Sequence, residues 1–158
     1  MSRCFGGMEM EFQIRQGQIM DAKAIYALNV KEMGYNYPIE KTEEKARGLL
    51  ESGKDKIFVA VAGGAVIGYV HACGYDAVYA PHLKNIMGIA VSSSFRKKGA
   101  GRALLKAVED WAQKDGAAGV RLASGAERTG AHAFYRRCGY TGGKRQIRFQ
   151  KVFEPPVR

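Results

Sequence analysis

The order of apolar and polar residues along this chain predicts most of its secondary structure. Short apolar or alternating runs predict strands at about residues 12–14, 57–62, 65–73, 86–91, 119–123 and 146–153. Apolar residues at helical spacing predict helices at about residues 22–28, 40–52, 102–115 and 129–138.

Turn and cap residues separate these segments. Gly63-Gly64 between two strand-like runs is typical of a β-hairpin. Asp21 is positioned to cap the first helix, and Gly53 follows the second helix as a C-cap. Gly139 ends the last helix. These signals support the element boundaries.

The order of elements indicates the fold class. Strands cluster in the first half and alternate with helices in the second, which favours an α/β (α+β) fold around a mixed sheet over a doubly wound one. No internal repeat, low-complexity tract or interdomain linker interrupts the pattern. We expect a leader at residues 1–9, a single domain at residues 10–154 and a tail at residues 155–158.

The net charge of +10 is unevenly distributed. Residues 1–90 contain ten Lys/Arg and ten Asp/Glu, whereas residues 91–158 contain fifteen and five. A field of one sign can steer an anionic ligand, a basic half can bind nucleic acid, or the charge can simply form a solvated face. Because no helix-turn-helix or RNP pattern is present, we do not expect nucleic acid as the partner.

The remaining composition excludes several classes of protein. The 158 residues are 46% hydrophobic, which is typical of a globular domain. The three cysteines form no C-x-x-C pair, so neither a disulfide framework nor a metal site is expected. No apolar run has the length of a membrane span or a signal peptide, so we expect a cytoplasmic protein without a membrane partner.

A basic glycine turn between a strand and a helix is the strongest chemical signal in the chain. Residues 96–101 read RKKGAG, between the strand at 86–91 and the helix at 102–115. The N-terminus of a helix has unpaired N–H groups, and glycine lets backbone approach a ligand closely. The turn therefore predicts a site for a phosphorylated ligand. It lacks the Lys-Ser/Thr of a P-loop and the third small residue of a dinucleotide fingerprint.

Two motifs resemble those of one enzyme superfamily. The pattern V-x4-R-x-x-G-x-G, from Val91 to Gly101, resembles the acyl-CoA pyrophosphate loop of the GNAT N-acyltransferases. Downstream, A-x-x-F-Y-x-x-x-G-Y from Ala131 to Tyr140 is similar to the second signature of that family. Both motifs occur in the family's order and in matching structural context.

The resemblance implies a fold, a cofactor and a reaction. The implied fold is a mixed, mostly antiparallel sheet of six to seven strands, splayed between strands 4 and 5 and flanked by four helices. The implied reaction is direct transfer of the acetyl group of acetyl-CoA to a primary amine of a small molecule or peptide. The residues that would contact the cofactor are Ile89, Ala90, Val91, Arg96, Lys97, Lys98, Gly99, Ala100, Gly101, Arg102, Arg128 and Phe134.

Tyr135 matches the family tyrosine that protonates the departing thiolate. A phenol with a pKa near ~10 can donate to a thiolate whose parent thiol has a pKa near ~8.5. The other interpretation is that Tyr135 only packs its helix. The acceptor would contact Tyr35, Tyr37 and His71, although exposed tyrosines also occur in plain loops.

The residue that removes a proton from the amine is not identified by the sequence. Many relatives place a carboxylate on the fourth strand, where this chain has Asn85 and Met87. His71, His82 and Glu127 are the alternatives, and a chain of water molecules is another. His71 could equally be a packed histidine.

Three further points stay open at this level. Arg128 departs from the Asn of many relatives, and the pattern R-x-x-A-H-x-F-Y resembles a subset that includes aminoglycoside-type N-acetyltransferases. Arg128 would contact the cofactor or form a surface ion pair. The rival functions are a non-catalytic acyl-CoA sensor and a basic RNA- or ribosome-associated protein. Family members often form homodimers, but no feature of this sequence decides the oligomeric state.

Overall fold

The computed structural model describes residues 11–154. The chain separates after Ala123 into two compact units, a first unit of residues 11–123 and a second unit of residues 124–154. The expected leader at residues 1–9 and tail at residues 155–158 lie outside the described residues.

Nine of the predicted elements are present, with some shifts in their ends. The first unit contains β1 (Gln13–Gln16), η1 (Ile19–Asp21), α1 (Ala22–Leu28), η2 (Asn29–Met33), α2 (Ile39–Glu51), β2 (Asp55–Ala62), β3 (Ala65–Ala77), β4 (Ala80–Val91), η3 (Ser93–Phe95), α3 (Ala100–Lys114) and β5 (Val120–Leu122). The second unit contains α4 (Thr129–Arg137).

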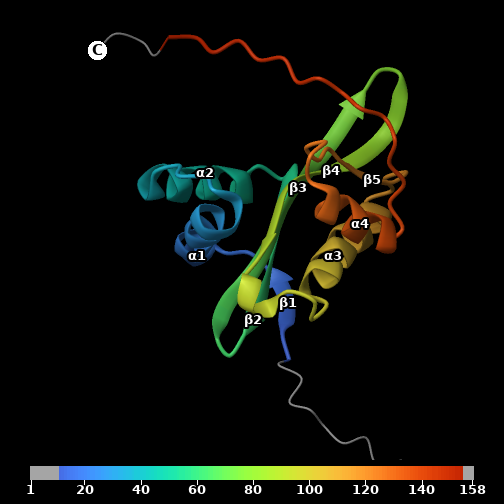
Figure 1. Cartoon of the computed structure of the whole chain (residues 1–158). Helices are drawn as coiled ribbons and strands as arrows, with labels where there is room; N and C mark the ends of the chain where they lie inside the picture. The colour runs from blue at the N-terminus through green and yellow to red at the C-terminus, as the bar shows by residue number, and fades with distance from the viewer. Residues whose placement is uncertain (1–10, 155–158) are drawn as a thin grey trace, which may run out of the picture. The chain divides into compact units, whose positions relative to one another are not determined.

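The first unit is a mixed sheet with helices on both faces. Its strands lie in the order β1-β2-β3-β4-β5, antiparallel except for the parallel pair β4–β5. Helices α1 and α2 cover one face and α3 covers the other (Figure 1). This arrangement confirms the mixed, mostly antiparallel α/β fold.

Each face of the sheet has its own part of the core. Toward α1 and α2, side chains from three strands and from α1 form one cluster, which contains Ile25, Leu28, Ile57, Val59, Tyr69 and Ala90. Toward α3, Leu104, Leu105 and Val108 are fully buried. Burying a side chain of this size stabilises the fold by about 1.5–3 kcal/mol, so these layers hold the strands in place.

The predicted hairpin is confirmed, and the strands β3 and β4 are longer than predicted. Gly63 and Gly64 have φ angles of 57° and 78°, which a tight two-residue turn requires. β3 continues to Ala77, and β4 already begins at Ala80. The pattern hid the start of β4 because the polar Lys84 occupies a buried position in it and is only 3% exposed.

Asp21 has a different role from the predicted cap of α1. Its side chain makes no capping hydrogen bond to α1 and instead accepts one from the Gln18 N–H at 2.7 Å. It also forms an ion pair with Arg15, whose nitrogens lie 2.7 and 2.9 Å from the two carboxylate oxygens. The Asp21 carboxylate therefore stabilises the turn η1 and not the N-terminus of α1.

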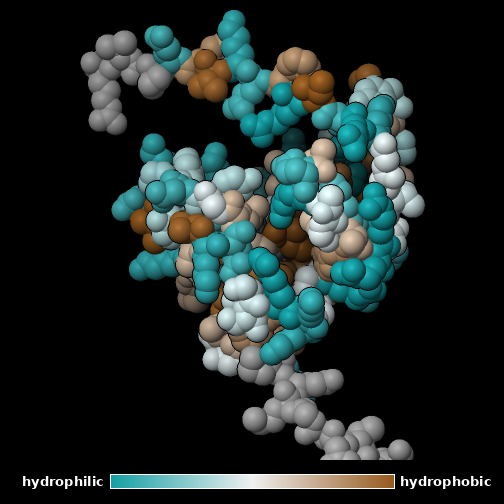
Figure 2. All heavy atoms as spheres, viewed as in Figure 1, coloured by the Kyte–Doolittle hydropathy of each residue, from teal (hydrophilic) through white to brown (hydrophobic). Residues whose placement is uncertain are grey.

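The predicted strand at residues 146–153 is wrong, so the described sheet has five strands and not six or seven. Residues 141–154 contain no helix or strand. A strand forms only where its backbone groups meet those of a neighbour, and none of the described strands pairs with this segment. Its large apolar side chains, which are Ile147, Phe149, Val152 and Phe153, are 79–89% exposed. Figure 2 shows apolar groups in tan and brown between hydrophilic ones along the C-terminal segment.

Candidate functional site

The N-terminus of α3 has an uncommon backbone geometry. α3 begins at Ala100, two residues before the predicted start, and Gly99 is its N-cap with a φ of 87°. Lys97 also has a positive φ, 63°, which costs a non-glycine residue about 1–2 kcal/mol. Ala103 donates to the Gly99 carbonyl at 3.0 Å, so the amides before it have no partner within the helix. This turn presents a row of N–H groups and the positive end of the helix dipole to an anion.

The basic side chains of this loop have different environments. The Arg96 guanidinium is paired with Glu32, with 2.9 Å between Nη2 and Oε2. Lys97 and Lys98 are exposed, and neither is paired with an acidic side chain within residues 11–154. The Lys98 ammonium lies 5.5 Å from the centre of the Phe95 ring. The two lysines therefore leave their charge available, whereas Arg96 shares its charge with a carboxylate.

The strand before the loop carries unpaired backbone on one side. β5 pairs with β4 only from Lys84 to Ile86. On its other side β4 stays paired with β3 as far as Val91. In the described part of the chain, Ile89, Ala90 and Val91 thus have no ladder partner toward β5. A parallel pair that ends partway along β4 is the splay between strands 4 and 5 that the resemblance implied.

A polar cluster lies beside this strand on the face toward α1 and α2. His71 on β3 is opposite Gly88 on β4, and a Cβ added to Gly88 would lie 3.6 Å from the Tyr69 hydroxyl. The His71 Nε2 lies 2.7 Å from the Asp55 Oδ1. Tyr69 donates to the Asn29 side chain. Burial raises the pKa of Tyr69 to about 12, so its phenol stays a donor at neutral pH.

Two expected acceptor contacts lie in the loop before α2. Tyr35 is 59% exposed and Tyr37 is 49% exposed. The Tyr35 N–H donates to the Asn29 carbonyl at 3.0 Å, which links the loop to the residue that binds Tyr69. The rings of Tyr35 and Tyr37 are therefore accessible to a ligand, and the backbone of their loop is held at Tyr35 by the hydrogen bond to Asn29.

Of the two alternative bases, only His82 lies in the same unit as His71. His82 lies on β4 six residues before Gly88, which is about 20 Å along a strand. Its ring contacts Asp76 at 2.8 Å and Asp115 at 3.9 Å. Glu127 belongs to the second unit, in the turn before α4. His71 is therefore nearer to the unpaired stretch of β4, because its partner Gly88 directly precedes Ile89.

The second unit holds the other signature. The Tyr135 ring lies 5.3 Å from that of Phe134 and 6.2 Å from that of Tyr140, measured between centroids. Burial raises the pKa of Tyr135, and the nearby Arg128 partly opposes this shift. Arg128 is the N-cap of α4, and the His132 Nε2 lies 2.8 Å from the Gly125 carbonyl oxygen. The histidine of the motif thus has a structural contact in the turn before the helix.

Some relevant residues carry no signal in the sequence. Asp55 and Asn29 orient His71 and Tyr69, and Glu32 contacts Arg96 across more than sixty positions of chain. Ser124 has a buried hydroxyl without a hydrogen-bond partner in the described residues. Long-range contacts of this kind cannot be inferred from spacing alone.

No group of three or more metal-ligating side chains lies close enough together to hold an ion anywhere in residues 11–154. In the same range, no helix combines the length and the apolar character that crossing a membrane would need.

Solved structures with the same fold include aminoglycoside N-acetyltransferases. The aminoglycoside N-acetyltransferase AAC(6')-Iy in complex with CoA superposes with a TM-score of 0.81 at 23% identity, over 89% of this chain and 95% of that one. The aminoglycoside 6'-N-acetyltransferase AAC(6')-Ih from Acinetobacter baumannii gives 0.79 at 17% identity, over 91% and 100%. At these identities the likeness shows the fold.

Sequence comparison gives the family. An aminoglycoside N(6')-acetyltransferase from Stenotrophomonas maltophilia is 27% identical over 72% of this chain and 76% of its own length. An uncharacterised N-acetyltransferase from Methanocaldococcus jannaschii is 32% identical over 58% of this chain, which spans 42% of that protein. The model of the acetyltransferase (GNAT) family matches residues 22–140. This chain therefore belongs to the GNAT acetyltransferase family, whose enzymes use acetyl-CoA.

Proposed function

We propose that this protein is an N-acetyltransferase that transfers the acetyl group of acetyl-CoA to a primary amine of a small molecule or peptide. The observation that carries the proposal is the junction of β4 and α3. Unpaired strand backbone leads there directly into a left-handed basic turn and a helix N-terminus. This combination suits a ligand with an amide-containing arm and a diphosphate.

The fit of the cofactor can be stated in terms of the residues present. The amides of Lys97 to Arg102 would bind the diphosphate. Lys97 and Lys98 would add charge to it, whereas Arg96 shares its charge with Glu32. The backbone of Ile89–Val91 would pair with the pantetheine amides. Acetyl-CoA supplies an activated acetyl thioester. Arg102, Arg128 and Phe134 complete the proposed contacts.

Tyr135 is the proposed acid. Its phenol would give a proton to the thiolate that leaves when the amine attacks the acetyl carbon. The raised pKa supports this role, because the group then stays protonated through the neutral range.

His71 is proposed to face the acceptor amine together with Tyr35 and Tyr37. A histidine held by a carboxylate can take a proton from an amine, and the 2.7 Å contact with Asp55 supports such a role. The similarity to aminoglycoside N-acetyltransferases suggests amino sugars as the first acceptors to try.

The direct test is release of CoA thiol from acetyl-CoA in the presence of an amine panel. The panel contains aminoglycosides, polyamines, amino acids and a lysine peptide. Calorimetry with acetyl-CoA alone accompanies it. Absence of heat on mixing would contradict the proposal at its base.

A sensor that binds acyl-CoA without turnover is the second candidate. Asn85 occupies a fourth-strand position where many relatives have a carboxylate, and its side chain accepts a hydrogen bond from Arg121. Binding of acetyl-CoA without thiol release for any amine would favour the sensor. A cytoplasmic location and a homodimer stay predictions, which cell fractionation and light scattering would test.

A further inference from the structure

We propose that Glu32 is a positioning residue that holds the loop after β4 in its ligand-binding shape and couples it to the acceptor loop. This inference rests on the proposed function, because it assigns a role in acetyl-CoA binding to a residue outside both family motifs.

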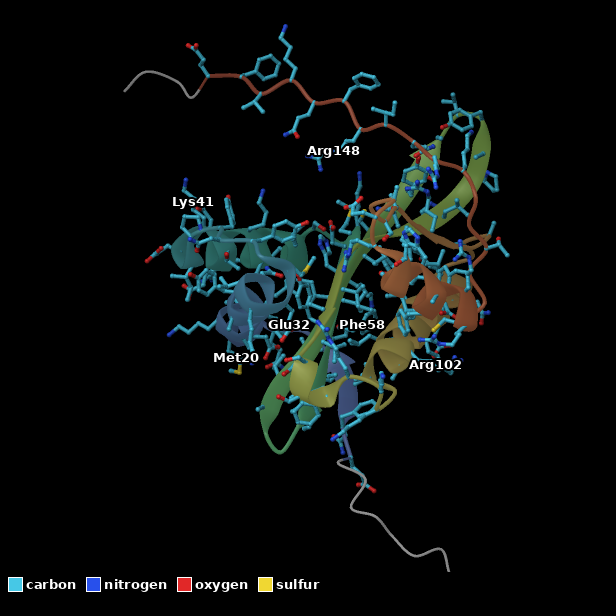
Figure 3. All side chains as sticks on the ribbon, viewed as in Figure 1. Met20, Glu32, Lys41, Phe58, Arg102 and Arg148 are labelled. Atoms are coloured by element: carbon cyan, nitrogen blue, oxygen red, sulfur yellow. The ribbon has the colours of Figure 1, made fainter. Side chains whose placement is uncertain are left out.

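The contacts of Glu32 link two distant parts of the first unit. Glu32 lies in η2, and its side chain is only 7% exposed. One carboxylate oxygen accepts a hydrogen bond from the Ser93 N–H at 3.0 Å, and the other accepts one from the Arg96 guanidinium at 2.9 Å. In Figure 3, Glu32 lies between the blue helical segment and the yellow turn that follows β4.

These two contacts enclose the turn η3. Ser93 is its first residue, and Arg96 follows its last. Directly after Arg96 come Lys97 and Gly99 with their left-handed backbone. A conformation that is unfavourable for lysine persists only if its surroundings fix it. The bonds to Glu32 fix the residues on the N-terminal side of that conformation.

The carboxylate is suited to this task by its charge. The Ser93 N–H, and then the nearby Arg96, hold the pKa of Glu32 below its ordinary value. The side chain is therefore ionised throughout the neutral range, and charge-assisted hydrogen bonds are the stronger kind.

η2 also contacts the acceptor side. It has π-helical hydrogen bonding, and its C-cap Gly34 has a left-handed conformation directly before Tyr35. Asn29, the first residue of η2, accepts hydrogen bonds from the Tyr69 hydroxyl and from the Tyr35 N–H. One short helical turn is thus bonded to the cofactor loop and to the acceptor loop. A shift of η2 caused by the binding of acetyl-CoA would therefore change the affinity for the acceptor amine, and the reverse would also hold.

The test measures acetyl-CoA affinity by calorimetry in three single variants and one double variant. Glu32→Ala removes both contacts, and we expect a Kd increase on the order of ten-fold. Glu32→Gln keeps an acceptor for Ser93 but loses the charge, so its Kd should rise about two- to three-fold. Arg96→Ala removes the ion pair and leaves the contact with Ser93. In the double variant its effect should not add to that of Glu32→Ala, because both single variants lose the same ion pair.

The control is Glu44→Ala, an exposed α2 carboxylate without an ion pair in the described residues, which should keep the wild-type Kd. CoA, which carries no acetyl group to transfer, is also titrated with and without an amine that supports turnover, and the ratio of its two Kd values should approach one in Glu32→Ala. If Glu32→Ala does not fold, Glu32→Gln and Arg96→Ala decide.

A lower melting temperature with an unchanged Kd would make Glu32 merely structural and overturn the proposal. Tighter binding in Glu32→Gln would also overturn it, because the carboxylate would then compete with the ligand for Arg96. Failure of the wild-type protein to bind acetyl-CoA would instead refute the proposed function itself.

Discussion

Single residues in this chain differ in what their surroundings allow them to do. Arg96 and Lys98 have the same expected role as cofactor contacts at the level of sequence, yet within residues 11–154 only Arg96 is paired with a carboxylate. Asp21 is a residue type that commonly caps a helix, but its carboxylate accepts a hydrogen bond from the Gln18 N–H and pairs with Arg15 on β1. The same residue type in the same motif therefore carries different chemistry, depending on partners that lie elsewhere in the chain.

Tyr135→Phe should lower kcat by about 10²-fold or more and leave the Kd for acetyl-CoA nearly unchanged. Only the hydroxyl is lost, and the ring keeps its packing. Because burial raises the pKa of Tyr135, activity that needs the protonated phenol should fall only above the ordinary phenol value near ~10. Steady-state kinetics across pH measures both effects. Tyr140→Phe is the control, and equal turnover in wild type and Tyr135→Phe would remove Tyr135 from the mechanism.

Asp21→Asn should destabilise the fold by about 1–2 kcal/mol at pH 7. The hydrogen bonds from Arg15, with the Gln18 N–H, lower the pKa of Asp21. A lowered folded-state pKa means stability that is present above the unfolded value of about 4 and is lost as pH falls through the folded value. The difference in unfolding free energy between the wild type and Asp21→Asn, measured by urea titration, should therefore shrink below pH 4. Asp110→Asn, which removes an exposed ion pair with Lys106, should change the unfolding free energy much less.

At the scale of elements, the spacing of apolar residues was sufficient to predict a helix or strand wherever one face of that element is buried. α3 is the clearest case, because its fully buried residues recur at helical spacing. The start of β4 was missed because Lys84 occupies a buried position in which an apolar residue is expected. Its ammonium bonds to Asp115 and lies 4.0 Å from the centre of the Trp111 ring. A buried lysine whose charge is paired in this way cannot be told from an exposed loop lysine in the sequence.

The hairpin shows a second limit of prediction. The turn pairs Ala62 with Ala65, and extending that register without a shift would place Asp55 opposite Ala72. A bulge at Ala60/Val61 moves the pairing by one residue, so that Asp55 is opposite Cys73 and can reach His71 on the same face. A slip of one residue exchanges the two faces of a strand. The histidine–carboxylate pair was therefore not accessible from spacing.

Gly99→Ala should weaken acetyl-CoA binding and destabilise the fold by about 1–2 kcal/mol. A Cβ at this position would meet nothing within 4 Å, so the cost comes from the φ of 87° and not from a clash. Gly48→Ala is the matched control, because Gly48 lies within α2 with equally open space. The free energy of unfolding of Gly48→Ala should rise by about 0.5–1 kcal/mol, and its affinity for acetyl-CoA should stay at the wild-type value. Thermal melts and calorimetry compare the two, and an unaltered Kd in Gly99→Ala would count against the loop.

At the scale of the whole chain, all of the net charge lies in residues 91–158. If this field steers the anionic cofactor, the association rate for acetyl-CoA should fall several-fold between about 50 and 500 mM salt. The dissociation rate should change less, and stopped-flow mixing separates the two. Binding of RNA with a steep salt dependence that saturating CoA does not alter would point to the nucleic-acid alternative.

The short ladder between β4 and β5 has a consequence for how this protein opens. Three residue pairs hold β5, whereas β4 and β3 are paired along most of their length. Local separation of β5 should therefore need less free energy than separation of β3 from β4. The fold places its proposed ligand beside the strand that is easiest to detach, so an occupied site would also brace the weakest junction of the sheet.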